Sequence, residues 1–439
     1  MRIRSGTGGR GPMSAWQRFE TTVATLRADA ERPDAKAVEG EPGWLPLETP
    51  LPARVRAAAE ALPRTPALLW DLEGLRRHAL HLVEVFGAYG IDVNLAMKSC
   101  SSVEVVRTLA ELGLGADAAS VYELEWAREA GFREISACGP GFTVADLPAL
   151  RATGALLDAV SVRQARAMLS APGTRRLGLR LRVPMPPALV SPTTKGRDSR
   201  FGVELTEDLA DELRSGPAKI SRLRVHTGES TSLTLGFRAA YALACARLLG
   251  GVDALNLGGG FLRLARRPKA LEEALLQLAP LFEEPAAEGE RYRVTVEPGG
   301  ALVADHAYLV TDVLDVEEHP SRGRLVTVDA SAWNVAPWSK VTFHVLGGAA
   351  GSEPATIAGP SLYELDMFTH RSDEGRYRFP LGRCAPGDRL VGTSVGSYTM
   401  TNGRSFHGLP LPAQYAVAGP EPSLLHGPFS YVEQGAAAR

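Results

Sequence analysis

Residues 94–118 read NLAMKSCSSVEVVRTLAELGLGADA, and this stretch sets the pattern of the fold. It starts as an apolar run that ends at Lys98 and continues with apolar residues at helical spacing as far as Gly113. A second apolar run then ends near Asp117. Short apolar runs that alternate with amphipathic segments are typical of parallel strands joined by helices. We therefore expect a strand, a helix and a second strand here.

The same alternation continues on both sides of this stretch. A short apolar run at residues 67–70 leads into helical spacing over residues 72–89. Eight apolar runs follow, and they end near Lys98, Asp117, Cys138, Ser161, Arg182, His226, Gly258 and Glu297. Eight strands that alternate with helices over about 210 residues predict a (β/α)8 barrel.

After residue 305 the pattern changes to apolar runs separated by Gly/Pro turns, without long helices between them. This indicates a C-terminal antiparallel β domain, so the fold class is α/β plus all-β. We expect the barrel at residues 66–305 and the β domain at residues 306–439. Residues 1–65 would form an N-terminal extension that packs on the β domain, with residues 1–12 disordered.

Composition excludes several classes of function. With 48 basic and 50 acidic residues, the net charge of −2 provides no basic surface for nucleic acid or for a membrane. The four cysteines are scattered, which predicts neither a metal site nor a disulfide framework. No apolar run approaches the roughly 18 residues that span a membrane, and the N-terminus lacks the apolar core of a signal peptide. We expect a cytoplasmic protein.

Residues suited to chemistry stand at the ends of the predicted strands: Lys98, His226, Gly258-Gly-Gly260 and Glu297-Pro-Gly299. Ligands of such barrels bind at this end, and phosphates favour the loops after strands 7 and 8. Glycines let backbone N–H groups approach a phosphate closely. A lysine among apolar neighbours tends to lose its proton and can form imines with carbonyl compounds. Taken singly, each residue also has an ordinary structural interpretation, such as a strand-end lysine that reaches water.

Taken in order, NLAMKS, GLGADAASVYELEWAREAG, LRLRV, HTGES, LNLGGGF, VEPGG, GPSLYELD and GSYT resemble the ornithine, diaminopimelate and arginine decarboxylases. These enzymes depend on pyridoxal 5′-phosphate (PLP) and share their barrel with alanine racemase. The resemblance spans roughly residues 65–410. It implies a decarboxylase, a carboxy-lyase, that acts on an amino acid or an amino-acid derivative. It also implies a homodimer with its active sites at the subunit interface.

The resemblance also assigns roles to single residues. Lys98 would hold PLP as an internal aldimine, His226 would stack on its ring, and Glu297 would pair with the pyridine nitrogen. The other positions implied in binding the cofactor are Asp117, Arg182, Ser230, Gly258, Gly259, Gly260, Gly299 and Tyr398. Glu123 matches a residue that supports this site, and it is equally suited to capping the helix that starts after Ser120.

The sequence departs from the family pattern near the phosphate. Gly300 stands where the family has an arginine, and Gly228-Glu-Ser230 replaces the usual Gly-Ser. A carboxylate beside a phosphate would repel it, so we expect Glu229 to point away and Ser230 to bind in its place. Both changes weaken the usual hold on the phosphate.

A further departure affects catalysis. Leu362 replaces a cysteine that, in the family, helps to protonate the carbanion left when CO2 departs. Tyr363 could act as this acid, or it could pack at an interface. Glu364 and Asp366 could contact a substrate amine from the partner subunit, or they could solvate a loop.

The substrate pocket also differs from those of the relatives. Residues 328–331 resemble the diaminopimelate decarboxylases more than the ornithine decarboxylases, yet Ala336 replaces an arginine that usually precedes Pro337. Trp333 and Trp338 could form a bulkier pocket, or they could pack in the β domain. Neither standard substrate is favoured.

Two other functions stay open. A PLP-dependent racemase or epimerase is permitted by the absent cysteine and by the nearby Tyr363. A catalytically silent PLP-binding homologue is suggested by Gly300, Glu229 and Leu362, although Lys98 is retained.

Overall fold

The computed structural model describes residues 13–31, 51–216, 218–283, 291–336, 339, 341–348, 353–369, 377–419 and 421–428. The expected disorder of residues 1–12 lies outside these ranges. The chain divides into two compact units. One unit takes in residues 1–41, 86–92 and 136–296, and the other takes in residues 42–85, 93–135 and 297–439. These units are not the three segments expected from the sequence, so the domain boundaries stay a prediction.

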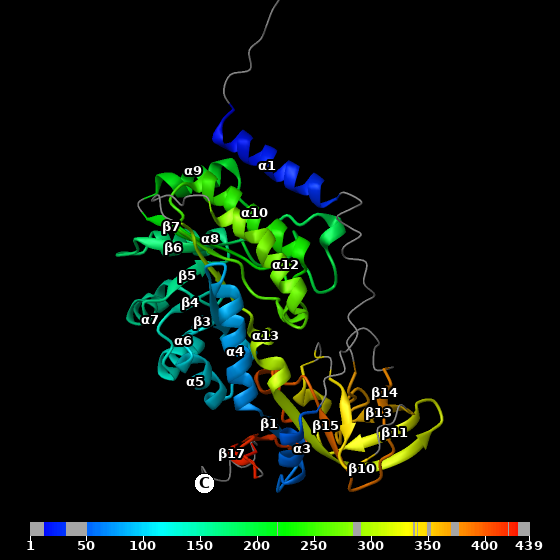
Figure 1. The fold of residues 1–439 in the computed structure, drawn as a ribbon. Coiled ribbons are helices and arrows are strands. Elements are labelled where there is room, and N and C mark those ends of the chain that lie inside the picture. The colour runs from blue at the N-terminus through cyan, green and yellow to red at the C-terminus, as the bar shows by residue number, and fades with distance from the viewer. Residues whose placement is uncertain are drawn as a thin grey trace, which may run out of the picture. The chain divides into compact units, whose positions relative to one another are not determined.

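Eight strands close into a barrel in sequence order, from β2 to β9. Figure 1 labels β3 to β7 among them. They are β2 (Ile91–Ala96), β3 (Gly115–Ala118), β4 (Ile135–Ala137), β5 (Leu156–Ala159), β6 (Arg176–Leu181), β7 (Lys219–Val225), β8 (Ala254–Asn256) and β9 (Arg293–Val296). The pairings described between neighbouring strands are parallel. Each strand ends within two residues of the end predicted for it, and the (β/α)8 barrel is confirmed.

Helices lie between these strands and directly before and after them. They are α4 (Leu72–Gly87), α5 (Val103–Glu111), α6 (Val121–Ala130), α7 (Leu147–Thr153), α8 (Val162–Leu169), α9 (Glu207–Ser215), α10 (Ser232–Leu249), α11 (Leu262–Ala265), α12 (Pro268–Leu278) and α13 (Gly299–Val303). Helix α6 has the expected signals, because the Ser120 hydroxyl accepts the N–H of Glu123 and Gly131 ends the helix at φ 96°.

The C-terminal part forms a mixed sheet in the order β14-β13-β11-β10-β1-β16-β17, and β15 pairs with β10 and β12. The strands are β1 (Ala67–Trp70), β10 (Ala307–His319), β11 (Gly323–Val328), β12 (Phe343–Val345), β13 (Glu353–Ala358), β14 (Phe379–Leu381), β15 (Arg389–Gly392), β16 (Ala413–Ala416) and β17 (Ser423–His426). Six of the eight pairings described for it are antiparallel, which confirms the predicted β domain.

Strand β1 corrects one expectation. The boundary at residue 66 placed this apolar run with the barrel, but β1 pairs antiparallel with β10 and parallel with β16. All four residues of β1 are buried. A strand buried on both faces is apolar throughout, whichever sheet it joins, so periodicity alone could not assign it.

The N-terminal extension also differs from the expectation. Helix α3 (Ala53–Glu60) packs on the mixed sheet as predicted, and Val55 belongs to a buried cluster with Tyr308 and Tyr415. Helix α1 (Ala15–Ala30) does not, because its Phe19 ring contacts Tyr241 of α10 at 6.2 Å between centroids. The extension is therefore divided between the sheet and a barrel helix.

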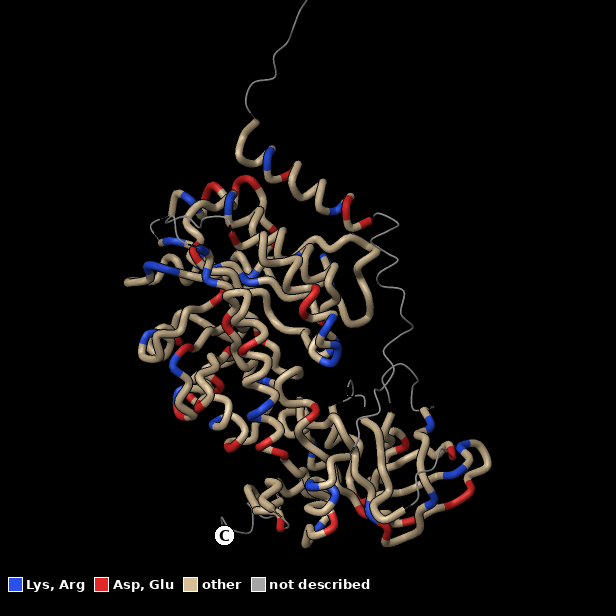
Figure 2. The backbone as a smooth tube through the Cα atoms, in the orientation of Figure 1, with Lys and Arg blue, Asp and Glu red and all other residues tan. Residues whose placement is uncertain are grey.

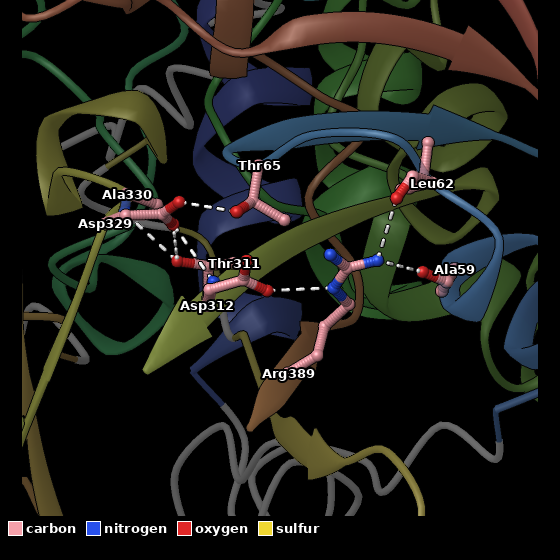
Figure 3. Close-up of polar contacts among 8 residues, drawn as sticks. All are labelled: Ala59, Leu62, Thr65, Thr311, Asp312, Asp329, Ala330 and Arg389. Carbon is pink, nitrogen blue, oxygen red and sulfur yellow. Dashed lines mark hydrogen bonds and ion pairs between the residues drawn. The ribbon is translucent and has the colours of Figure 1, made fainter. Parts of the chain in front are cut away.

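Arg389 of β15 fastens the end of α3 to the sheet (Figure 3). Its Nη1 donates to the carbonyl oxygens of Ala59 at 2.8 Å and Leu62 at 3.1 Å, and its Nε donates to Asp312 at 2.8 Å. These contacts satisfy carbonyl groups that the helix end leaves unpaired.

Asp329 forms a second group of hydrogen bonds in the same region (Figure 3). Its carboxylate accepts the hydroxyl groups of Thr65 at 2.5 Å and Thr311 at 2.6 Å, and the N–H of Asp312 at 3.0 Å. Burial raises the pKa of Asp329, and these hydrogen bonds oppose that rise. Asp329 thus has a structural role in the β domain.

Basic and acidic residues alternate along the backbone without a long run of one sign (Figure 2). Within the ranges that the structure describes, no helix is both long and apolar enough to cross a membrane.

Candidate active site

Lys98 lies on a 3-10 turn, Met97–Ser99, directly after β2. The Ser99 hydroxyl donates to the carbonyl oxygen of Ala96 at 2.7 Å, and Met97 and Ser99 are buried. Lys98 itself is exposed. The turn is therefore anchored by its neighbours while the amine stays accessible, which differs from the expectation that apolar residues enclose this lysine.

Two carboxylate side chains, those of Asp117 and Glu123, belong to the elements that follow the Lys98 turn. Asp117 at the end of β3 is buried, and Glu123 lies in the first turn of α6. Burial and the charge of Asp117 raise the pKa of Glu123, and burial is the larger cause. The Ala119 N–H, which donates to the Glu123 carboxylate at 2.7 Å, and the charge of Lys98 both lower this pKa. Glu123 therefore serves the helix start and interacts with the charge of Lys98, and its support of a cofactor stays a prediction.

Glu297 and Gly299 follow β9 in the same compact unit. The Glu297 side chain is buried. A Cβ atom on Gly299 would lie 2.8 Å from the Ser99 Oγ and 3.0 Å from the Ala96 Cβ. Only glycine permits this approach, so α13 begins directly against the turn that carries Lys98. The structure thus gives Gly299 a packing role at the site.

Tyr398 reaches the same turn from the end of the chain. Its N–H donates to the Ser99 carbonyl oxygen at 2.7 Å, and its φ of 62° is left-handed. Two residues earlier, a Cβ on Gly396 would lie 1.9 Å from the Val303 carbonyl oxygen. The segment around Tyr398 is therefore fixed against α13 and the Lys98 turn.

The second group of predicted residues lies in the other compact unit. His226 follows β7, and its Nδ1 accepts the Gly259 N–H at 3.1 Å. This hydrogen bond assigns the proton of a neutral imidazole to Nε2. A Cβ on Gly258 would lie 2.5 Å from the Val225 carbonyl oxygen, at a φ of 68°. Side chains are thus excluded where the glycine loop meets His226.

Ser230 and Gly260 join two loops of this unit. The Ser230 N–H donates to the Gly260 carbonyl oxygen at 2.7 Å, and a Cβ on Gly260 would lie 1.8 Å from the Gly228 oxygen. The Ser230 Oγ is buried and has no hydrogen-bond partner in the described part of the chain. A buried hydroxyl beside a glycine loop fits an anion such as phosphate.

Glu229 contacts the start of α11, and its expected direction away from the phosphate stays a prediction. Its carboxylate accepts the N–H of Arg263 in α11, at 3.3 Å. Burial raises the pKa of Glu229, and the charges of Arg238, Arg266 and Arg263 lower it.

Arg182 follows β6, and its place at the site stays a prediction. Its N–H donates to the Val203 carbonyl oxygen at 2.8 Å. Within the described ranges, its Nε is buried and has no hydrogen-bond partner.

The residues expected near the substrate divide into two kinds. Leu362, Tyr363 and Glu364 are exposed, with 93% of Leu362 accessible. Asp366 is buried, and its carboxylate accepts the Ser331 hydroxyl at 3.0 Å and the N–H groups of Ala332 and Ser361. Asp366 therefore closes a loop, and its contact with a substrate stays a prediction.

A cavity of about 280 Å³ lies beside this loop in the β domain. Trp333, Ala336 and Arg404 are among its lining residues, and the Trp333 ring contacts Tyr363 at 5.1 Å between centroids. Trp338, the other tryptophan expected here, lies outside the described residues. The expectation of a bulky pocket is thus supported at Trp333 only.

Sequence reasoning missed two residues that shape the glycine loop. Asn256 accepts the Gly258 N–H at 2.8 Å, and Arg238 donates to the Gly259 carbonyl oxygen at 3.2 Å. Both side chains are fully buried. Arg238 had a visible signal, because it stands alone in the apolar run Leu235–Cys245.

Comparison with known proteins gives a consistent result. The family model described as "Pyridoxal-dependent decarboxylase, pyridoxal binding domain" matches residues 72–304. A diaminopimelate decarboxylase of Deinococcus radiodurans is 26% identical over 82% of this chain and 92% of the relative. A crystal structure of diaminopimelate decarboxylase superposes with a TM-score of 0.71 at 21% identity, over 85% of this chain and 93% of the other.

A further solved structure has the same fold. It is a lysine/ornithine decarboxylase from Vibrio vulnificus complexed with putrescine, with a TM-score of 0.69 at 18% identity. The match covers 84% of this chain and 99% of that one.

Proposed function

The chain belongs to the pyridoxal-dependent decarboxylase family and is a PLP-dependent amino-acid decarboxylase, and we propose that Lys98 carries its cofactor. The single observation that supports this most is the packing of the Lys98 turn. The glycine of Glu297-Pro-Gly299 and the backbone of Tyr398 both contact Ser99, the residue after Lys98. Three separate parts of the sequence therefore meet at the turn that carries the exposed Lys98.

The residues present fit a phosphorylated pyridine. The buried Ser230 hydroxyl and the glycine loop 258–260 suit the phosphate. The buried Glu297 carboxylate suits a protonated pyridine nitrogen, and the imidazole of His226, fixed through its Nδ1, suits the flat ring. An accessible lysine suits the aldehyde.

Bound PLP supplies an electron sink for the charge left at Cα when CO2 departs. Lys98 would hold the cofactor through its amine and release it when the substrate amine takes its place. Glu297 would keep a proton at the ring nitrogen. Glu123 and Asp117 would orient the Lys98 amine through their charges.

Tyr363 is the proposed acid that protonates Cα. Leu362 has no acidic group, and the neighbouring Tyr363 side chain is 44% exposed beside Trp333. Its phenol would give a proton to Cα, and water would return one to the phenolate. This keeps the proton balance of decarboxylation, in which the departing CO2 is replaced by a proton.

We also propose that the working form is a homodimer. Leu362 and Leu365 are 93% and 59% exposed, and Phe406 is 37% exposed. Exposed apolar residues in one loop region favour contact with another protein surface. Light scattering after size-exclusion chromatography should give twice the mass of the chain, and Leu362→Asp should shift the protein toward monomer.

The substrate is proposed to be an amino acid whose far end carries a polar group. The curated relative is named a diaminopimelate decarboxylase, and a fold neighbour was solved with putrescine. The exposed Glu364 could bind an amine at that end. A panel of L- and D-amino acids that includes meso-diaminopimelate, lysine and ornithine should identify the substrate through released CO2. Exchange of the α-proton in D2O without CO2 would instead indicate a racemase.

All four cysteines are free thiols, which supports the proposal of a reducing compartment, the cytoplasm. Cell fractionation with an antibody to the full chain would test this location.

The cofactor assignment is tested by absorbance. Protein supplied with PLP should develop a band at about 420 nm that borohydride bleaches. Lys98→Ala should abolish the band, while Lys269→Ala, at an exposed lysine of α12, should leave it unchanged. A band that persists in Lys98→Ala would refute the assignment.

A further inference from the structure

Arg238 is a fully buried arginine in the middle of the apolar helix α10. Its Nη2 donates to the Gly259 carbonyl oxygen at 3.2 Å, and its Cζ lies 5.5 Å from the centroid of the Phe261 ring. Burying a guanidinium is unfavourable unless it meets hydrogen-bond acceptors and negative charge. The contacts place this cation directly behind the glycine loop.

The charge of this cation acts on the Glu229 carboxylate. Burial raises the pKa of Glu229, and Arg238 is the first of three arginines whose charge lowers it again. Glu229 directly precedes Ser230, whose N–H is bonded to Gly260. A carboxylate and the proposed phosphate-binding hydroxyl therefore share one short segment.

The loop geometry limits which groups can bind an anion. The Gly258 N–H is used by Asn256 and the Gly259 N–H by His226. Within the described residues, the Ser230 Oγ remains without a partner. Because few donors remain, the charge balance around the loop has a large effect on anion binding.

We propose that Arg238 is a positioning residue for the cofactor phosphate: it holds the glycine loop by the Gly259 carbonyl and neutralises Glu229. This rests on the proposed function, in which the loop binds that phosphate. This role of Arg238 explains how the chain can have Glu229 next to Ser230. The family's arginine is absent here, because Gly300 stands in its place. Removal of Arg238 would take away the first of the three arginine charges that offset Glu229, and leave more negative charge beside the anion.

The test is a double-mutant cycle on the full chain, read as the dissociation constant of PLP and, separately, of inorganic phosphate. Arg238→Met should weaken binding on the order of tenfold or more. Glu229→Gln alone should not weaken it. The double variant should bind within about threefold of wild type, because the Glu229 charge that Arg238 offsets is then absent as well. Arg247→Met, at an exposed arginine of the same helix, is the matched control and should bind like wild type.

A merely structural role for Arg238 predicts a different pattern. The double variant would then bind as weakly as Arg238→Met, and this result would overturn the proposal, as would unchanged binding by Arg238→Met. If Arg238→Met does not fold, Arg238→Lys, which keeps the charge, should bind within about threefold of wild type, and tenfold weaker binding would count against the proposal. Failure of the wild type itself to bind PLP or phosphate would reject the proposed function instead.

Discussion

The N–H of Tyr398 donates a 2.7 Å hydrogen bond to the carbonyl oxygen of Ser99, the residue next to Lys98. This bond connects the last part of the chain to the turn after the first barrel strand. Tyr398 adopts a left-handed φ of 62° to make it. The turn that carries Lys98 is thus held by a residue about 300 positions away in sequence, which requires the segment before Tyr398 to fit closely.

Gly396→Ala should therefore destabilise the protein and weaken cofactor binding. The added Cβ would lie 1.9 Å from the Val303 carbonyl oxygen, so the backbone must shift. We expect the free energy of unfolding to fall by about 2 kcal/mol or more in urea titrations. Gly427→Ala is the control, because a Cβ there meets nothing within 4 Å. Equal stability of the two variants would contradict this description of the segment.

Arg389→Met should loosen α3 from the mixed sheet. The arginine donates to the carbonyl oxygens of Ala59 and Leu62 and to the Asp312 carboxylate. Loss of these bonds should lower the free energy of unfolding by about 2–4 kcal/mol. Arg383→Met provides the comparison, since the Arg383 side chain is 91% exposed and should change stability little. Chemical denaturation of both variants decides the matter.

Stability should fall between neutral and mildly acidic pH because of His306. The pKa of His306 is lowered to about 4, first by burial and then by the charge of His78, while Asp305 and Asp71 oppose this. The rings of the two histidines lie 4.9 Å apart. Between pH 6.5 and 4, His306 binds a proton in the unfolded state, where its pKa is near 6.5, and stays neutral in the folded state. The stabilisation is therefore complete above that value and is lost as the pH falls toward 4, by up to about 3 kcal/mol.

His306→Asn tests this dependence. Unfolding free energies at pH 7.5 and pH 5 should differ less in the variant than in wild type. His81→Asn, at an exposed histidine of α4, should keep the wild-type difference. The same pH dependence in all three proteins would show that His306 does not cause it.

Tyr363→Phe should reduce the release of CO2 without removing the cofactor. Loss of a general acid lowers kcat by about 100-fold or more, whereas the absorbance band of the lysine-bound cofactor should be unchanged. Tyr122→Phe, at a tyrosine that is 84% exposed, controls for the substitution. Wild-type rates in Tyr363→Phe would rule this tyrosine out as the proton donor.

Much of the barrel could be predicted from the sequence because its signals are local. Each strand is a short apolar run, and caps such as Ser120 and stops such as Gly131 mark the helix ends. The sheet that β1 joins was not predictable because its partners, β10 and β16, lie hundreds of residues away. Strand pairing over such distances depends on tertiary contacts that periodicity does not encode.

The site was predictable where residue type alone restricts the chemistry. A glycine run and a strand-end carboxylate each suggest few roles. Side-chain direction was not predictable, and Asp366 illustrates this. Its carboxylate bonds to Ser331 and Ala332. Arg238 was overlooked because an arginine within an apolar helix indicates burial but not the loop that it supports.

The most direct test of the central claim is to identify the lysine that carries PLP. Wild-type protein loaded with PLP would be reduced with borohydride, digested and mapped by mass spectrometry. We predict that the cofactor is found on the peptide that contains Lys98, at close to one per chain. Attachment to any other lysine, or no attachment at full loading, would contradict the assignment of this site.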